Sequence, residues 1–288
     1  MHGKVCKSIY INQMTINHLV LSGGGIRGIL KMCGTVYRAE AEGKWSIENL
    51  KTIWATSAGT FVAVIVALQL PWEELENYFV HRPWDKIIKI EDMDFSKIFT
   101  SCGILDDSLI KEAFRPLFAA ADVDLTVTFK DFFKKTGIEL HFFCVELNKF
   151  ECVDMSHLTH PELQVIDAVY RSCCIPIVFC PKITENGEIY VDGGLLKNYP
   201  ARTCLERTGG DIETIYGIHC QAQAKNVENI VDFLQKLILN AFVKLNGEPV
   251  HLIHEEIITN DVSTNMVEQH YMLFSFPEQR RSLLHGEV

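Results

Sequence analysis

Three absences narrow the function of this 288-residue chain. It has no apolar run of the about 20 residues that a membrane-spanning helix requires, since its longest, from Phe61 to Leu70, stops at Pro71. It has no pair of Cys-x-x-Cys units, which argues against a structural zinc site. It also lacks an excess of positive charge, and a formal net charge of −10 disfavours nucleic acid as a partner. Because this charge gives no attraction to anionic lipid heads, any contact with a membrane must come from apolar surface.

The N-terminus and the cysteines predict a reduced, cytoplasmic protein. Residues 1–6 (MHGKVC) lack the apolar core of a signal peptide. The ten cysteines do not predict a disulfide framework, because that inference belongs to short secreted chains. Several, such as Cys144 and Cys180, lie in apolar runs, where a free thiol behaves as a small hydrophobic side chain. Peripheral contact with membranes stays open.

Strand-like and helix-like segments alternate along the chain, which predicts an α/β fold with a mainly parallel sheet and helices on its faces. We find no internal repeat, low-complexity tract or Gly/Ser linker, so a single domain over residues 1–288 is expected. The motifs described below lie within about residues 18–200. Residues 201–288 then complete the fold or cap it.

The expected strands are Leu19–Ser22, Thr52–Ala55, Glu139–Leu147, Glu151–Asp154, Glu188–Val191 and Glu213–His219. The expected helices are Ile29–Glu42, one that begins at Ala58, Asp107–Ala119, Pro161–Ser172 and Val227–Leu245. The three residues 148–150 between two of the strands suit a hairpin. For the last 40 or so residues no period is clear, and no element is assigned.

Residues 71–103 carry many large apolar side chains among charges, for example Trp84 and Phe99. The simpler interpretation is a helical cap that packs these side chains inward. The alternative is a lid or a lipid-facing surface, because exposed apolar patches mark interaction sites.

A glycine-rich segment, residues 23–28 (GGGIRG), is the most informative part of the sequence. It follows the strand-like His18–Leu21 and precedes a helix-like stretch, so several backbone N–H groups are left unpaired and suit an anion. The segment also satisfies the dinucleotide-binding pattern G-x-G-x-x-G. That fold wants an acidic residue about 20 positions later, at the end of the next strand. Glu40 and Glu42 lie instead in a helix-like stretch, which makes this alternative weak.

Ser57 lies in an A-x-S-x-G sequence between a strand-like and a helix-like segment. This pattern is one methyl group away from the G-x-S-x-G nucleophile elbow, which holds a serine strained and exposed. Ala55 is the departure, whereas Ala58 and Gly59 keep the other side small. Alone, such a serine is also found in ordinary turns.

Asp192 ends a strand-like run and is followed by Gly193 and Gly194. An Asp-Gly pair is common in plain turns. The functional interpretation is a carboxylate presented at the same edge of the sheet as Ser57, where ligands of open α/β sheets bind.

Taken together and in this order, the three blocks strongly resemble the patatin-like phospholipase family. Asn198 and Pro200 after the aspartate, and the stretch 173–176 (CCIP) before it, add to the likeness, which covers residues 18 to about 200. The resemblance implies a three-layer α/β/α fold that hydrolyses fatty-acyl esters, of phospholipids above all, without a metal or other cofactor. Its partner is thus a phospholipid or another acyl lipid.

The resemblance also assigns roles to residues. Ser57 is the nucleophile and Asp192 its partner in a catalytic dyad. The oxyanion hole is the glycine loop with Gly23, Gly24, Gly25, Arg27 and Gly28, and the elbow and turn are supported by Ala55, Gly59, Gly193 and Gly194. Arg27 either adds charge near the loop or braces it through carbonyl contacts.

The chemistry sets a further condition on Asp192. A serine hydroxyl is a poor nucleophile until a base takes its proton. A carboxylate with an ordinary pKa near 4 is a weak base in water. We therefore expect Asp192 to be desolvated or in close contact with Ser57.

Two alternatives stay open. His219 follows a strand-like run and would give the order Ser…Asp…His of an α/β-hydrolase triad. A degenerate, inactive patatin fold that binds lipid or a partner protein is the non-enzymatic alternative. Head-group and positional preference, the choice between phospholipase, lipase and thioesterase, and the oligomeric state do not follow from the sequence.

Overall fold

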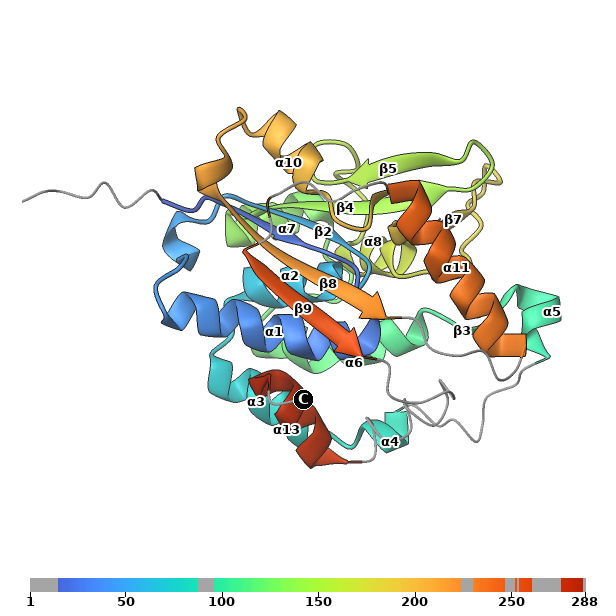
Figure 1. The fold of residues 1–288 in the computed structure, drawn as a ribbon, viewed down its shortest axis with the longest axis horizontal. Coiled ribbons are helices and arrows are strands. Elements are labelled where there is room, and N and C mark those ends of the chain that lie inside the picture. The colour runs from blue at the N-terminus through green and yellow to red at the C-terminus, as the bar shows by residue number, and fades with distance from the viewer. Residues whose placement is uncertain are drawn as a thin grey trace, which may run out of the picture.

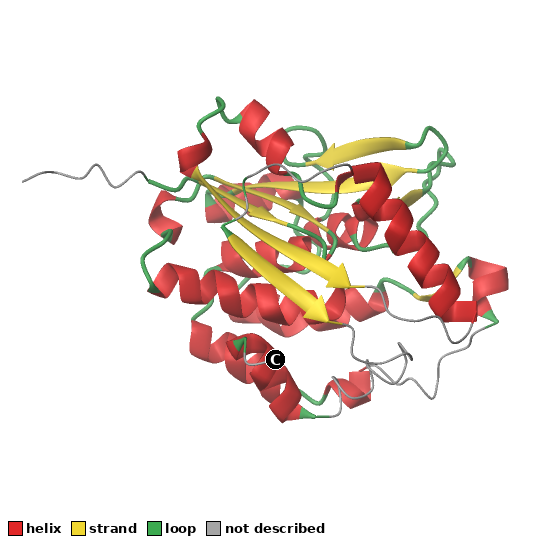
Figure 2. Cartoon of the chain, viewed as in Figure 1, coloured by secondary structure: helices red, strands yellow, loops and turns green. Residues whose placement is uncertain are grey.

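The computed structural model describes residues 15–87, 96–223, 230–246, 252, 254–260 and 276–286. Within these residues a central sheet has helices on both faces (Figure 1 and Figure 2). Most neighbouring strands of the sheet are parallel. The predicted α/β fold with a mainly parallel central sheet is confirmed.

The sheet of the described residues has seven strands, and a separate pair of strands lies outside it. Its strands are β1 (His18–Leu21), β2 (Thr52–Thr56), β4 (Glu139–Glu146), β5 (Glu151–Met155), β7 (Tyr190–Asp192), β8 (Ile215–Gln223) and β9 (Glu255–Asn260). They follow the order β5-β4-β2-β1-β8-β9, and β7 pairs with β4. The small pair is β3 (Gly103–Leu105) with β6 (Ile177–Phe179). The antiparallel neighbours are β5 and β7, both against β4, and β4 with β5 forms the hairpin expected from the sequence.

The helices connect these strands and cover them. In chain order they are α1 (Gly25–Ala41), α2 (Ala58–Leu68), α3 (Trp72–His81), α4 (Trp84–Ile87), α5 (Lys97–Ser101), α6 (Ser108–Ala120), α7 (Phe129–Thr136), α8 (Val165–Ser172), α9 (Gly194–Lys197), α10 (Ala201–Arg207), α11 (Ile230–Asn246) and α13 (Pro277–His285). Short 3-10 turns occupy Ile47–Asn49 and Ile212–Thr214.

The core is divided by the sheet. On one face α1, α2, α6 and α8 pack against side chains such as Leu19 and Phe142, and α2 is buried along its whole length. A smaller cluster on the other face joins Trp54 and Phe143 to Ala201 of α10. A helix that is buried on all sides is apolar all round, which explains the uninterrupted apolar run at 61–68.

The predicted elements are present within the described residues, with shifted ends, and residues 227–229 of the last expected helix lie outside them. The helix expected from Pro161 begins at Val165, because Gln164 is still extended and bridges to Thr128. Between 71 and 103, Phe79 and Trp84 are buried, as the cap interpretation requires, whereas Phe99 is 90% exposed. Three other large apolar residues of this stretch, at positions 88, 93 and 95, lie outside the described residues.

The described residues of the C-terminal part, for which no period was found, contribute two elements. β9 pairs with β8 in the sheet. α13 packs against α1 and α3, where the buried Arg280 donates to the carbonyl oxygens of Phe79 (2.8 Å) and Val80 (2.6 Å). Its helical period was hidden by charge, since the segment reads PEQRRSLLH.

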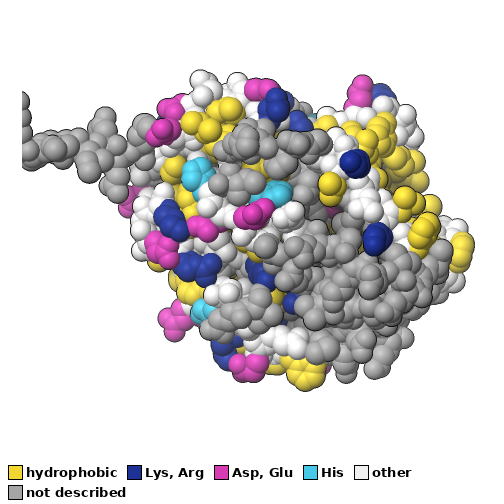
Figure 3. Space-filling model, in the orientation of Figure 1, with side chains coloured by type: hydrophobic (Ala, Val, Ile, Leu, Met, Phe, Trp, Pro, Cys, Tyr) yellow, Lys and Arg dark blue, Asp and Glu magenta, His cyan; other side chains and the backbone are white. Residues whose placement is uncertain are grey.

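Apolar side chains also reach the surface. Figure 3 shows them along the side of the molecule where α11 and the β4–β5 hairpin lie, and Phe150, Phe233 and Leu237 are about half exposed there. No described helix is both long enough and apolar enough to cross a membrane.

Candidate active site

Ser57 occupies a sharp turn between β2 and α2. Its backbone has φ 52° and ψ −125°, a conformation that is strained for a residue with a side chain. Gly59 allows the turn, because a Cβ there would lie 2.6 Å from the carbonyl oxygen of Leu21. Ala55 is fully buried in the core, so the strand accommodates the methyl group by which the motif departs from G-x-S-x-G.

Two hydroxyl side chains hold this turn. The N–H of Ser57 donates to Oγ of Ser172 (2.9 Å), and Ser172 Oγ donates to the carbonyl oxygen of Phe143 in β4 (2.5 Å). The hydroxyl of Thr60 donates to the Ser57 carbonyl oxygen (2.7 Å). The sequence motif gave no sign of Ser172, which comes from α8 and meets the turn only in the folded chain.

Asp192 lies directly beside the serine. Ser57 Oγ donates a 2.6 Å hydrogen bond to Asp192 Oδ2, and the N–H of Gly194 donates to the other oxygen, Oδ1, at 2.7 Å. Gly193 permits the close approach of this turn to β4, since a Cβ would lie 2.1 Å from the Phe143 carbonyl oxygen. Both carboxylate oxygens are therefore engaged.

Burial raises the pKa of Asp192 to about 7, and the hydrogen bonds from Ser57 and Gly194 offset part of that rise. The side chain is 1% exposed. A base with a pKa near the working pH is suited to taking a proton from a hydroxyl group. The desolvation expected for Asp192 is thus present.

The glycine loop lies against Ser57 and leads into α1. A Cβ on Gly23 would lie 3.3 Å from the Cβ of Ser57. The N–H of Gly23 donates to the carbonyl oxygen of Asn198 (3.0 Å), and that of Gly28 donates to Gly24 (3.1 Å). Among the described residues, no hydrogen bond from the N–H groups of Gly24 and Gly25 is found.

These free N–H groups stand at the N-terminus of a helix, since Gly24 caps α1 and Gly25 begins it. Gly25 has φ +62°, which favours glycine. A helix N-terminus carries a partial positive charge and unpaired donors, so this end of α1 can bind a negative charge next to Ser57.

Comparison with known proteins places this geometry in a family. A family model described as patatin-like phospholipase matches residues 19–205. The chain belongs to the patatin-like phospholipase family. The resemblance carried by the three motifs is confirmed.

The curated relatives are distant. A probable lipid hydrolase, 463L, of Invertebrate iridescent virus 6 is 25% identical over 187 residues, 63% of this chain and 61% of that protein. An uncharacterized protein, R571, of Acanthamoeba polyphaga mimivirus is 24% identical over 190 residues, 66% of this chain and 62% of that protein. The matches thus span about three fifths of these relatives.

The fold agrees with that of a solved structure, VipD from Legionella pneumophila. The TM-score is 0.52 with 18% sequence identity, over 94% of this chain and 67% of VipD. At this identity the likeness concerns the fold alone.

Two sequence-predicted residues lie outside the hydrogen-bonded centre. Arg27 makes no hydrogen bond or ion pair among the described residues, and its Nε is buried without a partner. Of the two roles expected for Arg27, the one in which it braces the loop through contacts with carbonyl oxygens is therefore not found among the described residues. His219 packs edge-on against Tyr199 (ring centroids 5.1 Å apart), and no hydrogen bond within the described part of the chain joins it to Asp192.

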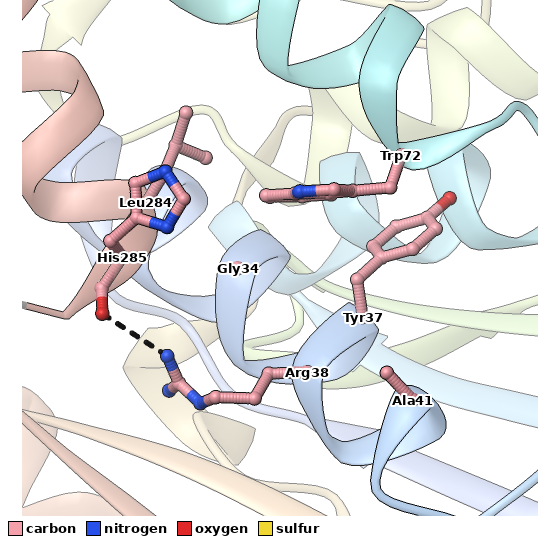
Figure 4. A pocket seen from close by; sticks show the side chains of 7 residues that line it. All are labelled: Gly34, Tyr37, Arg38, Ala41, Trp72, Leu284 and His285. Carbon is pink, nitrogen blue, oxygen red and sulfur yellow. Dashed lines mark hydrogen bonds between the residues drawn. The ribbon is translucent and has the colours of Figure 1, made fainter.

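Figure 4 shows the residues that line a cavity of about 200 Å³. Side chains of α1, α3 and α13 line it, among them Tyr37, Trp72 and Leu284. None of its lining residues belongs to the site around Ser57. The described residues also contain no group of three or more His, Cys, Asp or Glu side chains arranged to hold a metal ion.

Proposed function

We propose that this protein is a lipid acyl hydrolase that cleaves fatty-acyl ester bonds of phospholipids. The observation that carries the proposal is the 2.6 Å hydrogen bond from Ser57 Oγ to the buried carboxylate of Asp192. The glycine loop, in which Gly23 lies against Ser57, supports it too, because within the described residues the N–H groups of Gly24 and Gly25 have no hydrogen-bond partner and are available to the oxyanion that acyl transfer forms. Membership of the patatin-like phospholipase family and a relative with the name probable lipid hydrolase support the same chemistry.

In the first half of the reaction, Ser57 Oγ attacks the ester carbonyl carbon while its proton passes to Asp192. The carbonyl oxygen becomes an oxyanion, and the N–H groups of Gly24 and Gly25 donate to it. One such donor stabilises the transition state by about 3 kcal/mol. When the tetrahedral intermediate collapses, the alcohol of the lysolipid leaves with the proton from Asp192, and the acyl group stays on Ser57.

In the second half, water replaces the alcohol. Asp192 takes a proton from the water, the resulting hydroxide attacks the acyl-serine, and the same N–H groups receive the second oxyanion. Collapse releases the fatty acid and returns the proton to Ser57 Oγ. Gly23 has a different part in this scheme: its N–H is bonded to Asn198, so it serves by letting the loop approach Ser57.

A dyad accounts for the site better than a triad with His219. A triad needs the aspartate to orient a histidine that in turn contacts the serine. Here Asp192 contacts Ser57 directly, and its second oxygen is held by Gly194.

Apolar surface supports peripheral contact with a lipid aggregate. Phe150, between β4 and β5, and Phe233 and Leu237, of α11, are about half exposed. Figure 3 shows apolar side chains on the side of the molecule where these elements lie. Since the net charge is −10, we propose that apolar side chains, rather than charge, bring the protein to lipid.

The deciding experiment is mass spectrometry of the products formed from mixed phospholipid vesicles. We expect free fatty acid and lysophospholipid in equal amounts with the wild-type chain and neither with Ser57→Ala. The position of the remaining acyl chain gives the sn-1 or sn-2 preference. A folded wild-type protein that releases no acyl product, and whose Ser57 does not react with a fluorophosphonate probe, would show the inactive, lipid- or partner-binding alternative to be correct.

A further inference from the structure

The short helix α9, which follows Asp192, is held at both ends by one side chain from far along the sequence. Asn246 is the last residue of α11. Its Oδ1 accepts a hydrogen bond from the N–H of Asn198, and its Nδ2 donates to the carbonyl oxygen of Gly194 at 2.7 Å. The amide group of Asn246 thus joins Gly194, the first residue of α9, to Asn198, the residue directly after the helix.

The Asn246 amide replaces a backbone hydrogen bond that would otherwise extend α9 by one residue. The N–H of Lys197 bonds to the carbonyl oxygen of Gly193 (2.8 Å), and the next bond of an α-helix would run from Asn198 to Gly194. Asn246 occupies both of these groups instead. A helix of four residues is unstable by itself, because nucleation costs more than so few bonds return. External hydrogen bonds therefore decide its shape.

The same helix carries contacts to each part of the proposed site. Gly194 donates its N–H to Asp192 Oδ1 (2.7 Å), and Asn198 accepts from the N–H of Gly23 (3.0 Å). The groups that Asn246 binds belong to these two residues, Gly194 and Asn198. A displacement of either end of α9 would therefore move the carboxylate or the glycine loop.

A third contact joins α9 to the strand before the serine. The hydroxyl of Thr56 donates to the carbonyl oxygen of Lys197 at 2.7 Å. The base, the glycine loop and the strand that leads to Ser57 are thus all bonded to the segment 194–198. Asn246 lies outside the stretch 19–205 that matches the family model.

We propose that Asn246 is a positioning residue, through which α11 holds α9, and with it Asp192 and the glycine loop, in the arrangement that the reaction needs. This inference rests on the proposed function. The hydrogen bonds of the Asn246 amide described above go to backbone groups of the segment 194–198 and not to Ser57 or Asp192. Its loss should therefore lower kcat and leave the binding of substrate largely unchanged. A small misplacement of catalytic groups costs on the order of 10- to 100-fold in rate.

The test compares Asn246→Ala with Asn240→Ala, because Asn240 is an exposed residue of the same type on the same helix. Rates are expressed per active serine, counted by titration with a fluorophosphonate probe, so that misfolded protein does not contribute. We expect kcat to fall about 10- to 100-fold in Asn246→Ala, with KM within about twofold, and no change in Asn240→Ala. A kcat per titrated site within about twofold of the wild type would overturn the proposal.

A second pair of variants distinguishes a positioning role of Asn246 from a purely structural role. Asn246→Asp keeps the acceptor for Asn198, loses the donor to Gly194 and places a negative charge beside the turn that carries Asp192. A negative charge disfavours a second carboxylate, so the pH at which activity appears should move upward relative to the wild type. Asn240→Asp carries the same charge at an exposed position of α11 and should leave the pH at which activity appears unchanged. An unshifted profile in Asn246→Asp contradicts the proposal.

The rate of labelling by the fluorophosphonate keeps this inference distinct from the lipid substrate. If the wild type labels at Ser57 but hydrolyses no phospholipid, the proposed substrate is wrong, whereas slower labelling of Asn246→Ala still supports positioning. If labelling is equally fast in the two proteins, the positioning role is wrong whatever the substrate. If the wild type does not label at all, both proposals fall.

Discussion

Thr56 and Asp192 lie end to end along one edge of β4. Thr56 pairs with Phe143, and Asp192 pairs with the next residue, Cys144. Because β2 runs parallel to β4 and β7 runs antiparallel to it, the two strands approach each other head-on. Ser57, one residue beyond Thr56, thereby comes within 2.6 Å of the Asp192 carboxylate. The separation of the two groups is fixed by strand pairing and does not depend on a long loop.

The first prediction is that removal of either group abolishes activity. Ser57→Ala has no nucleophile, and Asp192→Asn retains a side chain of the same shape that cannot take the proton. We expect kcat to fall by on the order of 10³-fold or more in each. His219→Ala should retain activity within about threefold, since no hydrogen bond among the described residues joins His219 to either residue of the pair.

The measurement is release of labelled fatty acid from a phospholipid, with circular dichroism to show that each variant is folded. Substantial hydrolysis by Asp192→Asn, or its loss in His219→Ala, would favour the triad.

The second prediction concerns pH. Asp192 must be ionised to accept the serine proton, and its pKa is raised to about 7 by burial. The rate constant kcat/KM should therefore rise with pH through about 7 and fall about tenfold for each unit below it. A profile that stays flat down to pH 5 would mean that the base has an ordinary carboxylate pKa and would contradict the desolvated dyad.

A third prediction follows from the same burial but is measured as stability. Because the folded-state pKa of Asp192 lies above its unfolded value, the fold favours the protonated form, and that contribution is lost as the pH rises through about 7. At pH 8 the buried charge destabilises the protein, so Asp192→Asn should increase the free energy of unfolding by on the order of 1–3 kcal/mol.

Urea unfolding of the two proteins at pH 8 and at pH 5 tests this. The advantage of the variant should shrink at pH 5, where the folded wild type binds the proton. A variant that is less stable than the wild type at pH 8 would show that the carboxylate is well compensated where it lies.

Local chemistry explains how much of this could be predicted from the sequence. The serine elbow, the glycine loop and the Asp-Gly turn each consist of small residues next to apolar runs. The structure has each motif at the end of a strand, as the sequence predicted. The direction of β7 could not be predicted. The sequence placed Asp192 at the same edge of the sheet as Ser57 but did not say whether its strand is parallel or antiparallel, and the structure has it on a strand that pairs antiparallel with β4.

The supporting hydrogen bonds were equally out of reach. Ser172 and Asn246 meet the site from α8 and α11, more than fifty residues from the atoms of Ser57 and Gly194 that they bind. Nothing near them in the sequence marks them. The N–H of Gly23 looked like an oxyanion donor, yet it is bonded to Asn198, which only the folded chain reveals.

The fourth prediction distinguishes the glycines of the loop. A Cβ on Gly24 would lie 2.8 Å from the Cβ of Cys220 in β8, whereas one on Gly28 would lie at an ordinary 3.6 Å from the Sγ of the same residue. Within the described residues the N–H of Gly24 has no hydrogen-bond partner, whereas that of Gly28 donates to the carbonyl oxygen of Gly24. We expect Gly24→Ala to lower kcat by on the order of 100-fold and Gly28→Ala to change it less than about threefold.

Gly28→Ala should in addition stabilise the protein by about 0.5–1 kcal/mol, because alanine is the better residue inside a helix. Hydrolysis rates and thermal unfolding of the two variants give both results. Equal loss of activity in both would mean that the whole of residues 23–28 acts as one rigid donor loop.

The last prediction concerns a buried histidine in a strand of the central sheet. His141 of β4 is 2% exposed and stacks on Trp54 with ring centroids 3.6 Å apart. Its Nε2 lies 2.6 Å from Glu139, and its Nδ1 lies 3.0 Å from Asp154. Burial disfavours the charged ring, but the hydrogen bonds to the two carboxylates outweigh it and raise the pKa of His141. Both ring nitrogens can then donate, as a protonated imidazole does.

Because this pKa is raised above the unfolded value near 6.5, the contribution of His141 to stability is complete below about pH 6.5 and is lost as the pH rises through the folded-state pKa. His141→Gln should therefore lower the free energy of unfolding by about 1–3 kcal/mol at pH 6, and by less at pH 9. His285→Gln is the matched control, since His285 contacts Glu76 at the surface, where such pairs contribute little. Urea unfolding at the two pH values gives the comparison, and a difference that grows with pH would mean that the histidine is neutral in the folded protein.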